Sequence, residues 1–272
     1  MTIPEGSLAC FLDERDVSGG LVVGGFYIPK KFLLSLDNFM IKTKRDFGLK
    51  DEDTTKWNLR DKDCKNPRVQ RLLNRTNNLR TRIFSIINEM PIRIIMSLAW
   101  KGKPGNRENA WKWAFMNIMQ RISIILDRKK RSEKTEDMYP YLDVVFDLFP
   151  GGKPAEFYFE VYQDAFSKGY IFEKNTLPPL KNFNACPCLL VTSTKYSQAL
   201  QLVDYLVGAT SEFIEWCYTG KKEQNVRLFF SNFFSAFHKD DNNKVLGCGL
   251  IVNKYARRKI MDKLIYLGLE QT

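Results

Sequence analysis

Residues 8–14 read LACFLDE, an apolar run that ends in the adjacent carboxylates Asp13 and Glu14. Five consecutive apolar residues between polar neighbours predict a buried strand. Residues 20–28 form a second apolar run after a glycine turn, so the two runs predict a β-hairpin or strand pair. A side chain at the tip of a buried strand is held rigidly and still reaches solvent, which suits a metal ligand. Asp13 is therefore the first candidate for a functional side chain.

Downstream, the hydrophobic pattern alternates between the period of helices and that of strands. The sequence predicts strands at 92–100, 141–149 and 188–192. It predicts helices at 30–47, 68–90, 108–130, 154–166, 197–217 and 254–267. Strands that alternate with long helices are typical of the α/β class, and the N-terminal hairpin predicts a mixed sheet. Phenylalanines at helical spacing between 229 and 237 are expected in a core or an interface rather than in a base-stacking platform.

The composition indicates a folded protein without a membrane segment. The chain has 272 residues and is 44% hydrophobic, which is enough for one large domain or for one domain with an insertion. No apolar run approaches the roughly 18 residues of a membrane span, and the first residues lack the basic region of a signal peptide. The six cysteines show no ladder of paired spacings and are interpreted as reduced thiols. We therefore expect a cytoplasmic protein.

A single histidine, His238, narrows the possible chemistry. A Ser-His-Asp triad needs a histidine beside its nucleophile, and most catalytic zinc sites need several. Metal-free ribonuclease chemistry usually needs two. His238 lies in an aromatic segment and is interpreted as a surface or helix-end residue. In an enzyme of this composition, proton transfers fall to carboxylates, a lysine or metal-bound water.

The net charge of +11 is concentrated in one region. Residues 56–134 contain 20 Lys and Arg against 6 Asp and Glu, whereas the rest of the chain has 22 basic and 25 acidic residues. A segregated positive charge is the expected electrostatic footprint of a protein that binds a polyanion. The alternative is a basic surface that is solvated and has no partner.

Within this region, one predicted helix and one loop supply candidate contacts to nucleic acid. Helical spacing in 68–90 gathers its arginines on a stripe that can follow a phosphate backbone, and a solvated amphipathic helix is the alternative. The loop after the strand at 92–100 adds two lysines. The candidate nucleic-acid-binding residues are Arg68, Arg71, Arg75, Arg82, Lys101 and Lys103.

Two further aspartates resemble Asp13 in their position. Asp147 follows an apolar run, and Asp204 lies one turn into a predicted helix. Carboxylates on separate elements are hard oxygen ligands that suit Mg²⁺ or Mn²⁺ together with water and substrate phosphate. Two such ions can activate water and stabilise the leaving oxygen of a phosphodiester. Spacing alone leaves Asp16 and Asp143 as competitors, and it leaves the alternative that these aspartates begin turns or face solvent.

The order of these segments resembles a known family. Residues 11–14, FLDE, followed by a glycine-rich strand, resemble the N-terminal Asp-Glu-Ser-Gly motif of a bacterial and phage domain of unknown function. Residues 193–204, STKYSQALQLVD, resemble its second hallmark, a serine-rich turn that leads into Gln-Leu-Ala-Asp on a helix. Asp147 lies where that family has an aspartate after a central strand, and Lys56 lies where it often has a short acidic or histidine-containing motif. The resemblance covers roughly residues 8–215.

This resemblance implies an α/β fold with a ribonuclease H-like mixed sheet flanked by helices. Residues 1–218 would form this domain, including the basic helical region at about 56–134. Residues 219–272 would form a helical aromatic and basic extension packed on it. The resemblance implies a Mg²⁺- or Mn²⁺-dependent nuclease. The expected site residues are Asp13, Asp147 and Asp204 as metal ligands, Glu14 as a fourth ligand or general base, and Lys56 as a contact to the scissile phosphate or to the attacking water.

The residues after Glu14 leave other hypotheses open. Arg15 and Asp16 stand where the family has Ser-Gly, so a second hypothesis is an inactive nuclease-like fold that binds DNA, RNA or a partner protein. A third hypothesis is a subunit of a multi-protein system, such as phage defence, whose aromatic C-terminal region binds a partner or a second copy. A restriction-type nuclease is a distant alternative, because its carboxylate-x-Lys match at 127–129 lies at a predicted helix end.

Overall fold

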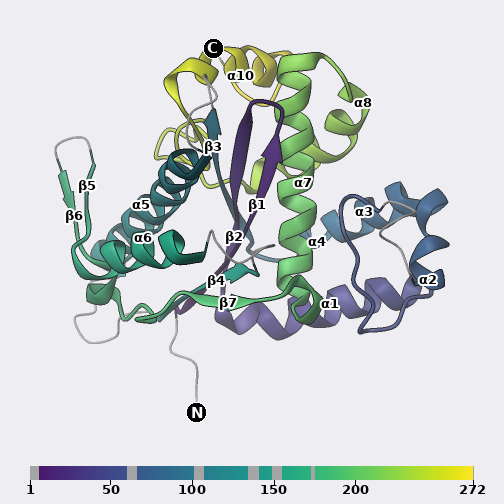
Figure 1. Ribbon diagram of the computed structural model, residues 1–272, viewed down its shortest axis with the longest axis horizontal. Coiled ribbons are helices and arrows are strands. Elements are labelled where there is room, and N and C mark those ends of the chain that lie inside the picture. The colour runs from purple at the N-terminus through teal and green to yellow at the C-terminus, as the bar shows by residue number, and fades with distance from the viewer. Residues whose placement is uncertain are drawn as a thin grey trace.

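A mixed sheet lies at the centre of the fold (Figure 1). The computed structural model describes residues 6–59, 66–100, 107–133, 141–148, 155–172 and 175–271. The main sheet has the strand order β7-β4-β1-β2-β3-β8. Its strands are β1 (Leu8–Val17), β2 (Gly20–Pro29), β3 (Arg93–Trp100), β4 (Leu142–Asp147), β7 (Leu190–Thr192) and β8 (Leu250–Val252). Adjacent strands are antiparallel from β1 to β3, whereas β4 is parallel to β1, β7 to β4 and β8 to β3.

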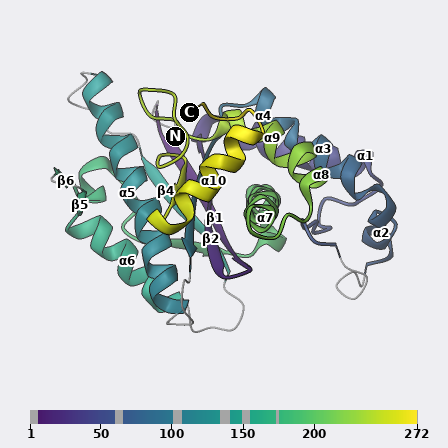
Figure 2. The same ribbon diagram turned by 90° about the horizontal axis from the view of Figure 1, so that it is seen from above.

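Helices cover both faces of this sheet. One face packs against α5 (Arg107–Glu133), on which α6 (Ala155–Ser167) lies. The other face packs against α7 (Gln198–Thr219), with α1 (Leu33–Asp46) and α3 (Thr76–Phe84) on the same side. Figure 2 shows the sheet between these two groups of helices. The expected α/β class with a mixed sheet is confirmed.

The alternation of side chains along β1 divides the core into two clusters. Phe11 packs into the cluster that includes α7, and Leu12 packs into the cluster that includes α5 and α6. Because successive side chains of a strand point to opposite faces, Asp13 continues the row that faces α7. Glu14 continues the row that faces α5 and α6. The same alternation on β4 puts Asp147 on the α7 side, since Val145 packs there.

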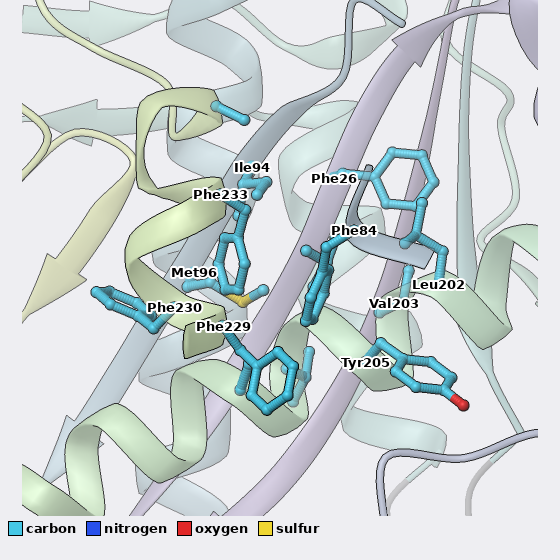
Figure 3. Close-up of a cluster of buried hydrophobic side chains, with 14 of the residues drawn as sticks. Phe26, Phe84, Ile94, Met96, Leu202, Val203, Tyr205, Phe229, Phe230 and Phe233 are labelled. Atoms are coloured by element: carbon cyan, nitrogen blue, oxygen red, sulfur yellow. The ribbon is translucent and has the colours of Figure 1, made fainter. Parts of the chain in front are cut away.

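Aromatic side chains from distant segments fill the core on the α7 side (Figure 3). The rings of Phe84 and Phe233 lie 5.0 Å apart between centroids, and those of Phe213 and Phe230 stack at 4.1 Å. All four residues are buried. Aromatic pairs of this kind contribute roughly 0.5–1.5 kcal/mol beyond the burial of their area. The expectation that the phenylalanines between 229 and 237 form a core is confirmed.

The continuous helix expected at 68–90 is wrong. The segment forms short pieces: α2 (Pro67–Gln70), a 3-10 turn (Leu73–Arg75), α3 and α4 (Ile86–Glu89). A hydroxyl side chain lies at two of the breaks. Thr76 donates to the carbonyls of Leu72 and Leu73, and Ser85 donates to the carbonyl of Arg82, so both compete for backbone acceptors of the preceding turn. The four arginines of the expected stripe therefore do not share one helix.

The C-terminal residues do more than pack as a helical extension. They add β8 to the edge of the main sheet, in parallel with β3. The remaining elements are α8 (Glu223–Asn225), a π-helical turn (Val226–Phe230), α9 (Ser231–Phe233), α10 (Lys254–Tyr266), and a separate two-stranded sheet of β5 (Tyr170–Phe172) and β6 (Asn175–Leu177). Short 3-10 helices occur at Lys30–Phe32, Leu180–Phe183, Thr194–Tyr196 and Phe234–Ala236. Among the described residues, no helix combines the length and apolar composition that crossing a bilayer requires.

His238 lies just beyond the 3-10 helix Phe234–Ala236, as the helix-end interpretation predicts, but it is partly buried rather than on the surface. Its Nδ1 lies 2.9 Å from the hydroxyl of Tyr27, and its backbone N–H donates to Ile94. Burial, followed by the positive charges of nearby arginines, lowers the pKa of His238 to about 4. The ring is therefore neutral at physiological pH and tethers the C-terminal segment to β2.

This environment predicts an acid-sensitive fold. Between pH 6.5 and 4 the unfolded chain protonates its histidine while folded His238 stays neutral. The free energy of unfolding therefore decreases as the pH is lowered through this window. The loss reaches up to ~3 kcal/mol. From pH 7 to pH 4.5, the urea midpoint should decrease more for the wild type than for His238→Gln, whose side chain does not titrate. An equal drop in both proteins would contradict the assignment.

Candidate active site

Three aspartates from three elements line one cleft. Leu12 and Phe146 are the last registered pair of β1 and β4, so Asp13 and Asp147 follow on adjacent parallel strands at the same level. Asp204 comes from α7, which packs on β1. The cleft has a volume of about 530 Å³. We call it the carboxylate cleft; its lining residues are Asp13, Glu14, Asp16, Thr54, Lys56, Asp147, Leu148, Ser193, Thr194, Lys195 and Asp204.

The carboxylates in this cleft repel one another. Burial raises the pKa of Asp13 well above its usual value, and the negative charges of Asp204 and Asp147 raise it further. Burial also raises the pKa of Asp204, although the N–H of Trp57 and the positive charges of Arg15 and Lys56 oppose the rise. Like charges at close range in a partly desolvated site are unfavourable without a counter-charge. A cation between these side chains would relieve the repulsion.

Backbone N–H groups hold each carboxylate. Asp13 accepts a hydrogen bond of 2.7 Å from the N–H of Glu14, and Asp204 accepts one of 2.5 Å from the N–H of Trp57. Asp147 accepts from the N–H of Leu148 at 2.8 Å and from both the N–H and the hydroxyl of Thr194. Hydrogen bonds to an ionised acceptor are about twice as strong as neutral ones, so these side chains are well oriented.

Gln201 connects the two walls of the cleft, a role that the sequence did not reveal. Its side chain is fully buried. The carbonyl oxygen lies 3.3 Å from both the N–H and the hydroxyl of Thr55, and the amide nitrogen donates to the carbonyl of Thr194 at 3.2 Å. Thr55 precedes Lys56, and Thr194 holds Asp147. The only sequence signal was the Gln-Leu-x-Asp pattern, whose first and last residues lie one helical turn apart on α7.

A Gln201→Met variant tests this connection. It keeps the size of the side chain but removes the hydrogen bonds that Gln201 makes to the N–H and hydroxyl of Thr55 and to the carbonyl of Thr194, which should cost about 1–3 kcal/mol in the free energy of unfolding. Gln198→Met is the matched control, because Gln198 lies on the same helix and donates to Asp51 at 3.3 Å without touching the cleft. Urea denaturation should show the larger loss in Gln201→Met. Equal losses would contradict the bridging role.

The segment that carries Lys56 is anchored by Trp57 behind the cleft. Trp57 is fully buried, and the guanidinium of Arg80 lies 3.7 Å from its ring centroid and donates to its carbonyl. Gly208 on α7 allows the indole to lie directly on the helix, since a Cβ there would overlap the Trp57 ring. This packing fixes the backbone N–H that binds Asp204.

The other candidate acids, Glu14, Asp16 and Asp143, differ in whether they line the cleft. Glu14 lines the cleft, and its carboxylate accepts a hydrogen bond of 3.2 Å from the hydroxyl of Tyr158 on α6. Asp16 also lines the cleft. Asp143 does not; it forms an ion pair of 2.7 Å with Lys30. Of the two competitors for a metal-binding role, only Asp16 therefore lies in the cleft.

The candidate arginines make contacts within the protein. Arg68 forms a two-pronged ion pair with Asp53, at 2.9 and 3.0 Å. Arg75 lies over the ring of Phe47 at 4.9 Å, and Arg82 lies over that of Phe39 at the same distance. Arg71 is exposed, and the candidate residues Lys101 and Lys103 lie outside the described residues. A role of these cations in binding nucleic acid remains a prediction.

The donor set fits Mg²⁺ or Mn²⁺ only in part. In the described portion of the chain, no group of three or more His, Cys, Asp or Glu side chains is arranged to hold an ion. Both oxygens of Asp147 instead accept hydrogen bonds from Thr194. Mg²⁺ is usually bound by one or two carboxylates plus water and substrate phosphate, and this smaller demand suits Asp13 and Asp204.

Comparison of the chain with protein-family models, with curated proteins and with solved structures finds no match. Arguments about function therefore rest on the carboxylate cleft and its surroundings.

Proposed function

We propose that the protein is a metal-dependent nuclease that hydrolyses nucleic-acid phosphodiester bonds in the carboxylate cleft. The observation that carries this proposal is the gathering of Asp13, Asp147 and Asp204 in one cleft, where burial and then the charges of Asp204 and Asp147 raise the pKa of Asp13. Mutual repulsion of this kind is unfavourable in the metal-free protein, and a bound divalent cation would relieve it. Perturbed carboxyl groups that converge in a cleft are a recognised mark of functional sites.

The sheet topology supports a ribonuclease H-like core as the finer description of the fold. The order β3-β2-β1-β4-β7 is antiparallel over its first three strands and parallel thereafter. A mixed sheet flanked by helices is what the sequence resemblance to the ribonuclease H-like family implies. Carboxylates at corresponding levels of β1 and β4, with a third from the helix after β7, agree with this proposal.

The protein's own residues would divide the work. Asp13 and Asp204 would hold Mg²⁺ or Mn²⁺, with Asp147, which Thr194 keeps oriented, adding its negative charge to the site. The metal supplies positive charge for the phosphate and a more acidic bound water. Lys56, which is exposed in the cleft, would contact the scissile phosphate, and Glu14 would accept the proton of the attacking water. His238 has no part in this division of roles, because it bonds to Tyr27 and is not among the lining residues of the cleft.

Arg15 motivates a second candidate function. It stands where the resembling family has serine, and its charge opposes the rise that burial causes in the pKa of Asp204. A guanidinium beside the carboxylates can supply the counter-charge that a metal would otherwise provide. The alternative is therefore an inactive nuclease-like module in the cytoplasm that binds DNA, RNA or a partner protein, such as a subunit of a phage-defence system.

A cleavage assay on the full chain tests the first proposal against the second. We expect labelled DNA or RNA oligonucleotides to be cut with Mg²⁺ or Mn²⁺ and to stay intact with EDTA. Retained binding with no product under any metal would favour the inactive module. Cleavage that survives both EDTA and Asp13→Ala would overturn the proposed site.

Metal binding should also appear as stabilisation without any substrate. A ligand at 100 times its dissociation constant adds about 2.7 kcal/mol to the free energy of unfolding when it binds only the folded state. We therefore expect Mn²⁺ to raise the melting temperature of the wild type, and to have little effect on Asp204→Asn. A shift of the same size in both proteins would place the ion elsewhere.

A further inference from the structure

We propose that the carboxylate cleft receives a single strand of nucleic acid, and that Lys195 and Tyr196 form a subsite at its edge for one phosphate and one unpaired base. This inference names the substrate form for the proposed function and rests on it. The subsite belongs to the 3-10 turn Thr194–Tyr196, which joins β7 to the start of α7. Sequence patterns did not single out this pair.

The dimensions of the cleft favour one strand over a duplex. A second hollow of about 170 Å³ adjoins the cleft and shares Asp13, Glu14, Lys56 and Asp204 with it. The path therefore continues past the carboxylates toward Arg15 and Asn58. A cleft of about 530 Å³ lies in the size range of sites that enclose one small ligand, roughly 300–1,000 Å³. It suits a nucleotide of an extended strand, whereas paired bases are hidden inside a helix and must be extruded to enter a pocket.

Lys195 and Tyr196 provide the two contacts that single strands need. Lys195 lines the cleft and is exposed, and its Nζ lies 5.3 Å from the centroid of the Tyr196 ring. Tyr196 is 77% exposed, so its ring is accessible to a base. Proteins that bind single strands combine cations along the backbone with aromatic rings on which bases stack. Leu148, which is 60% exposed, adds an apolar side chain to the lining of the cleft.

Hydrogen bonds order the turn that presents Tyr196 and link it to the carboxylates. Ser193 accepts from the N–H of Lys195 through its hydroxyl and from the N–H of Tyr196 through its carbonyl. Thr194, which lies between Ser193 and Lys195, holds Asp147, and its carbonyl accepts a hydrogen bond from the side chain of Gln201. A base stacked on Tyr196 would thus lie at a fixed offset from Asp147. This fixed distance would place the phosphate next to the stacked base at the carboxylates.

The charge of the cleft adds a condition. Five carboxylates and two lysines line it, so a polyanion meets net negative charge there until divalent cations bind. Binding of the strand at this subsite should therefore need a divalent cation. This requirement separates it from binding to the exposed basic surfaces, which salt only weakens.

Tyr255 offers a closely matched control for the experiment. It is also 77% exposed, and Lys254 lies over its ring at 5.2 Å. It belongs to α10, which follows β8, whereas Tyr196 follows β7, and these two strands form opposite edges of the sheet. The two tyrosines thus share type, exposure and lysine partner, and differ in their place relative to the cleft.

The test is fluorescence anisotropy of labelled 12-mer DNA and RNA single strands and of the matching DNA duplex, with the full chain in CaCl₂, and a gel to verify that the strands stay intact. We expect single strands to bind more tightly than the duplex, and EDTA to weaken this binding. Tyr196→Ala should weaken it about 5- to 150-fold, while Tyr196→Phe retains it and Tyr255→Ala leaves it unchanged. The DNA and RNA arms identify which sugar the subsite prefers.

The outcomes separate this inference from the proposed function. Equal losses in Tyr196→Ala and Tyr255→Ala, or tighter binding of the duplex, would overturn the subsite even if cleavage is found. Tyr196-dependent binding of single strands without cleavage under any metal would uphold the subsite and reject the nuclease. Lys195→Ala should remove about one phosphate contact. The slope of the logarithm of the binding constant against the logarithm of the salt concentration should then become shallower by roughly 0.7.

Discussion

Asp13→Asn should abolish metal-dependent cleavage and, at the same time, stabilise the folded protein. Loss of a residue that merely supports a metal ligand already costs about 10- to 100-fold, so loss of a ligand should cost at least about 100-fold in activity. The stability change has the opposite sign. Burial and the charges of Asp204 and Asp147 raise the pKa of Asp13, which means that the ionised side chain destabilises the fold. A neutral amide of the same shape removes this repulsion.

The two effects are measured by initial cleavage rates in Mn²⁺ and by urea midpoints at pH 7.5 without metal. Asp143→Asn is the matched control, because Asp143 is on the adjacent β4 but pairs with Lys30 outside the cleft. That control should keep its activity and gain no stability. A less stable Asp13→Asn protein would show that the N–H of Glu14 matters more to Asp13 than the repulsion does.

Gly25→Ala should destabilise the protein by about 3 kcal/mol or more. Gly25 lies opposite Leu12 in the centre of the sheet. A Cβ at this position would overlap the carbonyl oxygen of Phe11. Because this neighbour is backbone, no rotamer change can relieve the clash, and β1 must move just before Asp13. We therefore expect loss of activity together with loss of stability.

Gly220→Ala serves as the control for this substitution. Gly220 ends α7 in the left-handed region with φ of 71°, and a Cβ there would meet no atom within 4 Å. Its cost is the backbone preference alone, roughly 1–2 kcal/mol. Thermal unfolding and the cleavage rate should both distinguish the variants, with activity retained only in Gly220→Ala. Similar midpoints for the two would contradict the close approach of β1 and β2.

Local patterns were sufficient to predict much of the fold. Period-2 and period-3.6 hydrophobicity located the strands of the main sheet apart from β8, and the long helices. The helix at 68–90 failed because its apolar spacing is regular while Thr76 and Ser85 compete for its backbone carbonyls. β8 has only three residues, as β7 does, and its run was not recognised as a strand before the predicted helix at 254–267.

The candidate site was predicted where it depends on strand ends, and missed where it depends on distant pairs. Asp13 and Asp147 follow apolar runs, so their side chains could be found from the sequence. The bond between Trp57 and Asp204 joins residues 147 positions apart, and the bonds of Gln201 to Thr55 span 146. No periodicity reports such contacts, because they arise only when α7 packs against the loop that carries Lys56.

The parallel pairing of β1 with β4 also has a consequence for the order of folding. β1 meets β2 across a two-residue turn, whereas Leu8 pairs with Leu142, 134 residues later. Closing long loops is entropically costly before any contact rewards it, so non-local parallel strands join late and slowly. The hairpin is expected to form early during synthesis, while Asp147 and Asp204 are not yet translated or not yet docked. Assembly of the chain thus keeps the three carboxylates apart until the sheet is complete.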